Sequence, residues 1–199
     1  KGLHIGYLNV FTLEKTNKKK MFMPKKKRIL FVISTLGDGG AERVVTYILA
    51  ALDTQKYDIG LLLYIKKGPR LSQVPAHVRI FDLEKKSRFD FLKIILGTRK
   101  VLLEYAPNTV VSFLYYTNIV TSLACLFLKR KFKLILGERN YPPEDLKRAR
   151  LGILKQWLVK WTYHKADLVT ANSERTRKAL AEQFEVPAQK LKVIYNPID

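Results

Sequence analysis

Short, continuous apolar runs alternate with longer stretches whose apolar residues recur every three or four positions, from residue 28 onward. The runs are typical of strands buried on both faces, and the longer period is typical of the helices that cover them. The runs predict strands at 28–34, 59–64, 78–81, 109–113, 133–136, 168–170 and 192–194. The intervening stretches predict helices at 41–52, 89–105, 118–128 and 146–163, and a further helix that Ser173 caps, with Leu180 and Phe184 inward. This order predicts an α/β fold with a doubly wound, mostly parallel sheet.

Residues 1–27 break the pattern. They carry two clusters of three lysines and little that a core can bury. We expect a basic extension that is disordered or not native to the protein. Because Met21 and Met23 stand just before the first strand, we expect the natural start at one of them and residues 1–20 upstream of it. The first residues also lack the basic-then-apolar layout of a secretory signal.

Composition excludes several classes of protein. The 199 residues hold 37 Lys and Arg against 17 Asp and Glu, a formal net charge of +20, yet 47% of the chain is hydrophobic. That apolar fraction excludes a disordered polycation, and the length fits one globular unit at 28–199. The single cysteine, Cys125, excludes a disulfide framework and a cysteine-based zinc site, and the three histidines lie far apart, so we expect no metal site. A reducing, cytoplasmic compartment follows most simply.

The longest uncharged stretch, 109–128, is long enough to span a membrane as a helix. Polar side chains interrupt it, among them Ser112, Asn118 and Thr121. A strand followed by a buried helix accounts for the same residues without placing an amide in lipid. We therefore expect no membrane span.

Candidate chemistry gathers where strands end, because ligands of doubly wound sheets sit beyond the carboxyl ends of the strands. The first strand leads into Gly37-Asp38-Gly39-Gly40-Ala41-Glu42-Arg43. Gly39 and Gly40 let the backbone turn sharply and bring N–H groups at a helix start against an anion, so we expect a phosphate-binding loop that includes Glu42 and Arg43. The alternative is a glycine turn needed only for the connection, with Glu42 complementing the helix dipole and Arg43 solvated.

Two further strand ends carry hydrogen-bonding side chains. Ser112 lies in the fourth predicted strand, and Tyr116 and Asn118 follow it. These side chains can grip a hydroxyl-rich ligand, or else Asn118 caps a helix while the tyrosine packs. The fifth strand leads into Gly137-Glu138-Arg139-Asn140, where the Arg139 guanidinium can hold a phosphate through two parallel hydrogen bonds. The alternative is a surface pair of Glu138 with Arg139, which contributes little.

Five landmarks occur in order along the chain: GDGGAER, VVSFLYYTN, GERN, VTANSERTRKAL and KVIYNPID. Together they resemble the N-terminal half of a family 4 glycosyltransferase with the GT-B fold, over residues 28–199. Within that family the pattern looks most like enzymes that extend polyprenyl-diphosphate-linked glycans or build surface polysaccharides.

The resemblance implies a retaining, metal-independent transfer of a sugar from a nucleotide-diphosphate sugar to an acceptor hydroxyl, with no further cofactor. It implies that this Rossmann-like half holds the acceptor, and that Gly39 and Gly40 approach the donor diphosphate or the acceptor. The residues expected to line the acceptor side are Ser112, Tyr116, Asn118, Arg139 and Asn140.

Two departures from the family pattern limit what is carried over. Tyr115 and Tyr116 occupy a region where many members have a histidine, so no catalytic residue is assigned. The family's nucleotide-sugar-binding domain, with its paired glutamates, would begin after Asp199, where this chain stops. We therefore expect the chain alone to fold but to transfer no sugar.

The predicted helix at 146–163 combines Trp157 and Trp161 with many basic side chains. One side can bury while cations and an indole face an anionic membrane surface, so we expect a cytoplasmic protein, peripheral on the inner face of the membrane. The alternative is an ordinary core helix with a solvated face. The cations are Lys147, Arg148, Arg150, Lys155, Lys160 and, just after the helix, Lys165.

The positive charge also fits a basic nucleic-acid-binding α/β module. Against this class, the basic residues are spread among helices without a motif that reads DNA or RNA, so we expect no nucleic-acid partner. A non-catalytic α/β scaffold is a third alternative.

Overall fold

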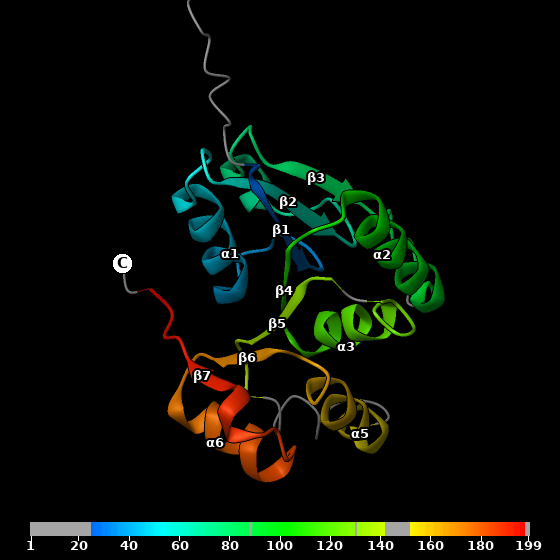
Figure 1. Ribbon diagram of the computed structural model, residues 1–199, viewed down its shortest axis with the longest axis vertical. Helices are drawn as coiled ribbons and strands as arrows, with labels where there is room; N and C mark the ends of the chain where they lie inside the picture. Colours follow the sequence, from blue (N-terminus) through cyan, green and yellow to red (C-terminus); the bar gives the residue numbers. More distant parts are fainter. Residues whose placement is uncertain (1–24, 88, 130, 142–151, 198–199) are drawn as a thin grey trace, which may run out of the picture.

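The computed structural model describes residues 25–87, 89–129, 131–141 and 152–197. Within them lies a sheet of seven strands, all paired in parallel, in the order β3-β2-β1-β4-β5-β6-β7 (Figure 1). The strands are β1 Lys27–Ile33, β2 Tyr57–Leu63, β3 Arg79–Asp82, β4 Thr109–Phe113, β5 Lys133–Glu138, β6 Leu168–Ala171 and β7 Leu191–Val193. The predicted α/β fold with a doubly wound sheet is confirmed.

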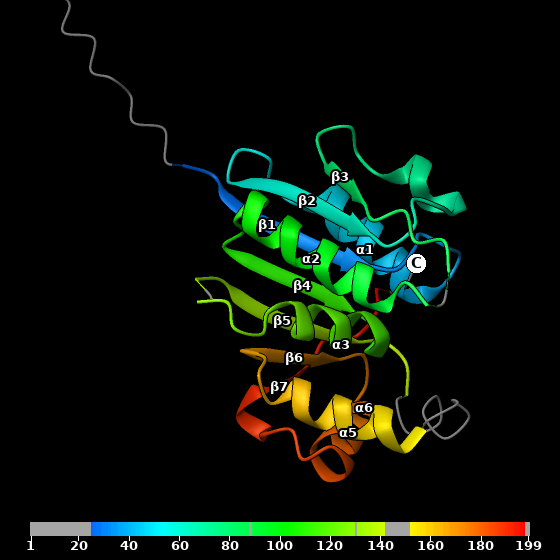
Figure 2. The ribbon, with the colours of Figure 1, turned by 90° about the vertical axis from the view of Figure 1, so that its right-hand side faces the viewer.

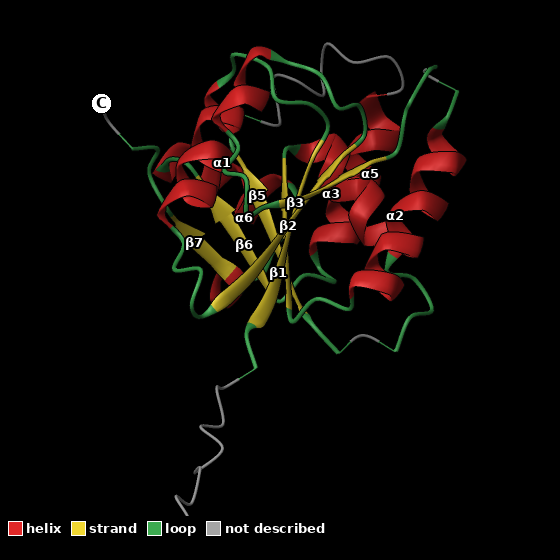
Figure 3. Cartoon of the chain, turned by 90° about the horizontal axis from the view of Figure 1, so that it is seen from above, coloured by secondary structure: helices red, strands yellow, loops and turns green. Residues whose placement is uncertain are grey.

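Helices cover both faces of this sheet. They are α1 Gly40–Ala51, α2 Phe91–Tyr105, α3 Tyr115–Ala124, α5 Gly152–Tyr163 and α6 Glu174–Gln183, with the short 3-10 helices η1 Pro69–Gln73 and η2 Ala188–Lys190. Figures 2 and 3 show α1 on one face and α2, α3 and α5 on the other. The predicted helical residues before Gly152, and residues 1–24 of the predicted extension, lie outside the described residues. Lys27 belongs to β1 rather than to the extension.

The burial of β1 explains its continuous apolar run. Leu30 and Val32 are fully buried in the cluster beneath α2 and α3, whereas Phe31 and Ile33 are buried in the cluster beneath α1. Successive side chains of a strand point to opposite faces, so a strand covered on both sides needs an apolar residue at every position. Each such side chain stabilises the fold by about 1.5–3 kcal/mol relative to its exposed state.

The strand order creates a switch point between β1 and β4. From β1 the chain runs outward through β2 to β3, then crosses to β4 and continues to β7 in the opposite direction. The connections after β1 and β4 therefore leave toward opposite faces, to α1 and to α3 (Figure 2). Doubly wound sheets bind ligands at the carboxyl edge of such a switch point.

The helix after β4 begins earlier than the sequence predicts. β4 ends at Phe113, and Leu114 turns the backbone with φ 73°, so α3 starts at Tyr115 rather than at residue 118. Asn118 therefore lies inside the helix, and the alternative in which it caps the helix is wrong. The same helix ends at Ala124, before residue 128.

β5 is longer than the predicted strand at 133–136. Gly137 pairs with Phe113 of β4, and Glu138 pairs with Ala171 of β6. A Cβ atom on Gly137 would lie 3.0 Å from the Phe113 ring, so the small residue lets β4 and β5 approach. Neither glycine nor glutamate favours a strand by itself, and the two neighbouring strands determine this end.

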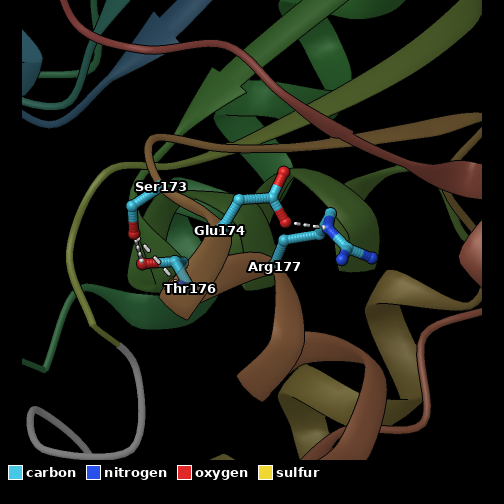
Figure 4. Close-up of polar contacts among 4 residues, drawn as sticks. All are labelled: Ser173, Glu174, Thr176 and Arg177. Atoms are coloured by element: carbon cyan, nitrogen blue, oxygen red, sulfur yellow. Dashed lines mark hydrogen bonds and ion pairs between the residues drawn. The ribbon is translucent and has the colours of Figure 1, made fainter.

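The predicted cap of the last helix is confirmed. Ser173 Oγ accepts a hydrogen bond from the Thr176 N–H at 3.1 Å, as Figure 4 shows beside the ion pair of Glu174 with Arg177 at 2.6 Å. This bond satisfies one of the backbone donors that every helix start leaves without a partner. Leu180 and Phe184 point into the core, as predicted.

In the described part of the chain, every helix is too short or too polar to cross a lipid bilayer. The uncharged stretch at 109–128 contains β4 and α3 instead.

Candidate functional site

The carboxyl end of β5 sends two consecutive side chains to opposite faces of the sheet. Glu138 meets Tyr163 of α5, whereas the Arg139 guanidinium lies 5.6 Å from the ring centroid of Phe113 in the cluster beneath α1. Strand alternation explains this separation. Glu138 is fully buried and Arg139 is only 8% exposed, so the alternative of a surface pair is wrong.

Arg139 connects β5 to the segment that follows β7. Its Nη1 donates to the carbonyl of Ile194 at 2.8 Å and to Oδ1 of Asn196 at 3.4 Å. Its Nε is buried without a hydrogen-bond partner among the described residues. Burial lowers the pKa of the guanidinium from its ordinary value, while the charge of Glu138 acts in the opposite direction. An arginine stays protonated in either case, so a buried cation stands at this edge.

Asn196 lies between this cation and the start of α1. A Cβ atom built on Gly40 would have only Asn196 Nδ2 near it, at 3.8 Å, among the described residues. Figure 1 shows the segment after β7 running towards α1. The structure therefore brings two of the predicted site residues, Gly40 and Arg139, to either side of one amide group, and Gly40 is exposed.

The two glycines of the loop differ in what surrounds them. Gly39 is the N-cap residue of α1 and makes no side-chain capping bond, and Glu42 turns back so that a Cβ atom on Gly39 would overlap its carboxylate. Arg43 is half-buried, and its N–H donates to the Gly39 carbonyl at 3.1 Å. Gly39 makes room for Glu42, whereas Gly40 exposes the positive end of the helix.

A buried polar network lies on the other face of the sheet. Tyr163 donates to Oε2 of Glu138 at 2.7 Å, and Asn118 Nδ2 donates to the Tyr163 hydroxyl at 2.9 Å and to the carbonyl of Gly137 at 3.2 Å. The other carboxylate oxygen of Glu138 accepts the N–H groups of Arg139 at 3.2 Å and Asn140 at 3.4 Å. The network thus holds the backbone of the loop that carries Arg139.

The remaining predicted acceptor residues lie at different depths. Ser112 and Asn118 are fully buried, and Ser112 Oγ accepts from Thr121 of α3 at 3.3 Å. The half-buried Tyr116 ring packs against Tyr64 with 6.1 Å between centroids, whereas Asn140 is exposed. Contacts of these side chains with an acceptor stay predictions.

Three residues at this edge were missed as site residues. Asn196 appeared in the sequence only within a family landmark, and Tyr163 had the spacing of an ordinary core position. Asn172 donates to the carbonyl of Arg139 at 2.7 Å and so ties β6 to the same loop. Asn172 could have been found from the sequence, because it is a polar residue directly after a strand. No local sequence pattern indicated the contacts of Tyr163.

Comparison with known proteins decides the family. Residues 38–199, which are most of the chain, match the model of Glycosyltransferase Family 4. The chain belongs to glycosyltransferase family 4. The resemblance seen in the sequence is thereby confirmed.

Two curated relatives of this family 4 chain come from Campylobacter jejuni. One is N-acetylgalactosamine-N,N'-diacetylbacillosaminyl-diphospho-undecaprenol 4-alpha-N-acetylgalactosaminyltransferase, 28% identical over 175 residues, which cover 84% of this chain and 47% of the relative. The other is GalNAc-alpha-(1->4)-GalNAc-alpha-(1->3)-diNAcBac-PP-undecaprenol alpha-1,4-N-acetyl-D-galactosaminyltransferase, 31% identical over 121 residues, 57% of this chain and 32% of the relative. The chain spans half or less of the length of these relatives.

A solved structure gives the same fold. Anabaena HepE, in complex with UDP and glucose, superimposes with a TM-score of 0.64 at 20% identity, over 86% of this chain and 45% of that one. The Rossmann-like fold of the matching part of that structure is therefore present here.

Proposed function

We propose that this chain is the acceptor-binding half of a retaining glycosyltransferase that moves a sugar from a nucleotide-diphosphate sugar to a polyprenyl-diphosphate-linked glycan. The names of both Campylobacter relatives describe undecaprenyl-diphosphate-linked substrates, which supports this acceptor class. The observation that carries the proposal is the open helix start at Gly40 beside the buried cation of Arg139, at the switch-point edge of a family 4 chain.

The chemistry explains why positive charge is needed at this edge. In the transfer, the bond between the anomeric carbon and the diphosphate breaks, and a bond to the acceptor oxygen forms. The acceptor hydroxyl gives up its proton to water, and the nucleotide diphosphate leaves with an added negative charge. We propose that no metal and no further cofactor takes part, so this charge falls to protein donors. The first N–H groups of α1 are such donors in this chain, and we assign the Arg139 guanidinium to the phosphate of the acceptor.

Arg139 has hydrogen-bonding capacity left for a phosphate. The contacts with Ile194 and Asn196 use only Nη1, and Nε has no partner among the described residues. A guanidinium carries five N–H donors, so binding its own chain and binding an anion are compatible.

Arg139→Ala is expected to weaken use of the acceptor about tenfold to a hundredfold in kcat/KM, because charge-assisted hydrogen bonds of about 1.5–3 kcal/mol are lost. Donor KM should stay the same. The measurement is initial-rate kinetics of the enzyme purified from its native cell, with each substrate varied in turn, and thermal melting by circular dichroism confirms folding. Arg139→Lys is the matched variant, because it keeps the positive charge but loses the planar set of N–H donors. Its kcat/KM for the acceptor should lie between the values of the parent and Arg139→Ala. Unchanged acceptor kinetics in Arg139→Ala would remove the guanidinium from the acceptor site.

We further propose that the protein lies peripherally on the cytoplasmic face of an anionic membrane, on the layer of α2, α3 and α5 that Figure 2 faces. Large apolar side chains are exposed on this layer: Leu92 is 65% exposed, Leu96 56%, Ile153 86% and Trp157 57%. Of the described residues of α1 on the other face, Tyr47 is the one comparable side chain, at 42%. An apolar surface of this kind marks an interaction site.

The charges of this layer select anionic lipid as the partner. Within the described residues of α2, α3 and α5 the cations are Lys93, Arg99, Lys100, Lys155 and Lys160 and the one acid is Glu104. Lys100 pairs with Glu104 at 3.8 Å, and Lys160 pairs with Glu185 at 2.6 Å. Trp157 and Trp161 stack with 6.1 Å between centroids, and Lys165 Nζ lies 4.8 Å from the Trp161 centroid. A cavity of about 350 Å³ opens beside them. Apolar side chains among cations suit a lipid interface better than nucleic acid, and we expect no nucleic-acid partner. Lys147, Arg148 and Arg150 lie outside the described residues.

Vesicle binding tests this surface, and the chain carries its own probe because Trp157 and Trp161 are its only tryptophans. Phosphatidylglycerol vesicles should shift their emission to the blue, and salt should reverse the shift, since each surface cation contributes about 1 kcal/mol over a Debye length of about 8 Å. Replacing Leu92 and Leu96 together by Glu should lower the affinity about tenfold or more, whereas Tyr47→Glu on the opposite face should not. Equal binding to neutral and anionic vesicles would contradict the proposal.

A further inference from the structure

The Glu138 carboxylate is an unusual group to find completely buried in a strand. Among the described residues, its two oxygens accept from the Tyr163 hydroxyl on one side and from the N–H groups of Arg139 and Asn140 on the other. An ionised carboxylate accepts at both oxygens, so this set of donors satisfies it where water cannot enter. An apolar side chain would fill the same space at lower cost, and it could not hold two consecutive N–H groups of a loop.

Tyr163 determines where that carboxylate points. It is the last residue of α5, fully buried, and its hydroxyl is fixed from behind by Asn118 of α3. Burial, and next the charge of Glu138, raises the pKa of Tyr163 well above its ordinary value. The phenol therefore stays protonated and remains a donor to Glu138.

We propose that Tyr163 and Glu138 are positioning residues of the acceptor site: the phenol orients the carboxylate, and the carboxylate fixes the backbone from which the Arg139 and Asn140 side chains extend. This proposal rests on the acceptor role proposed for that loop. The chain of contacts continues from Arg139 to Asn196 and so reaches the start of α1 at Gly40. It also joins the loop to α5, whose outer surface we assign to lipid.

Tyr163→Phe removes one hydroxyl and keeps the ring, so it tests the contact without emptying the core. The matched control is Tyr105→Phe. Tyr105 is also buried, at 3% exposure, and its hydroxyl donates to the carbonyl of Asp58 at 2.9 Å, on strand β2 rather than at this loop. Both variants lose one hydrogen bond, so loss of stability alone does not distinguish them.

Two readouts separate a positioning role from a structural one. The first is the pair of backbone amide resonances of Arg139 and Asn140 in the 199-residue chain, which sense their carboxylate acceptor. Both should move in Tyr163→Phe and stay in place in Tyr105→Phe. The second is acceptor KM in the enzyme purified from its native cell, which should rise about tenfold in Tyr163→Phe, with donor KM unchanged, as expected for a weakened hydrogen bond to a charged group.

Glu138→Gln provides a second variant of the same size. An amide offers one acceptor oxygen to the three donors, so the amide resonances should move and acceptor KM should rise at least as far as in Tyr163→Phe. Unmoved resonances in both variants would overturn the positioning role, whatever the enzyme transfers. Resonances that move while acceptor KM stays constant would overturn the acceptor role of the loop, and with it the proposed function of this edge.

Discussion

Gly68→Ala is expected to destabilise the chain by about 2–4 kcal/mol, which lowers the melting temperature by roughly 5–15 °C in a protein of this size. Gly68 has φ 126° and ψ 155°, a backbone conformation open only to glycine. A Cβ atom there would also overlap the carbonyl of Leu36 and lie 2.8 Å from Gly37 N. Both the strain and the overlap must be relieved by moving backbone.

The backbone that would move leads into the site. Leu36 is fully buried, its N–H donates to the Lys67 carbonyl at 2.9 Å, and its carbonyl accepts from Arg70 N at 3.2 Å. The next residues form the glycine loop. Thermal melting by circular dichroism measures the effect, and Gly40→Ala is the control, because its Cβ atom meets nothing closer than 3.8 Å. Equal melting temperatures of Gly68→Ala and the parent would show that this turn is adaptable and does not fix the loop.

Gly40→Val is expected to lower turnover about a hundredfold and to leave the fold intact, in contrast to Gly68→Ala, which is expected to lower stability. The side chain would occupy the space beside Asn196 through which we propose that a diphosphate approaches the first N–H groups of α1. Valine in a helix is less favourable than alanine by under about 1 kcal/mol, so stability should change little. The assay is transfer of radiolabelled sugar by the enzyme from its native cell, with Gly40→Ala as the intermediate case. Parent-like turnover would mean that the glycine serves only the connection.

The strands at the centre of the sheet are readable from sequence because helices on both faces demand apolar residues without a break. The run at 28–34 corresponds to β1 Lys27–Ile33, and the run at 109–113 coincides with β4. The carboxyl edge is also predictable as the place for a site, because topology alone puts it there.

The partners of the site residues could not be read in the same way. Glu138 and Tyr163 are 25 residues apart in the sequence, and Arg139 and Asn196 are 57 residues apart. Such pairs depend on how distant elements pack, and no local pattern encodes them. Composition misleads as well, since Glu and Arg are rarely buried, yet these two are buried because strand alternation directs each to a prepared partner. The predicted start of α3 was wrong because Leu114 adopts a positive φ that its residue type disfavours. The identity of that residue therefore gave no indication of the turn.

The most direct test of the account is the destination of the sugar. The enzyme purified from its native cell is incubated with radiolabelled nucleotide-diphosphate sugars and a lipid extract of the same cells that contains polyprenyl-diphosphate-linked glycans. The account predicts label in the organic-soluble glycolipid, with the anomeric configuration of the donor retained, and less of it with Arg139→Ala. Label that enters only water-soluble products, or a glycolipid with inverted configuration, would contradict it.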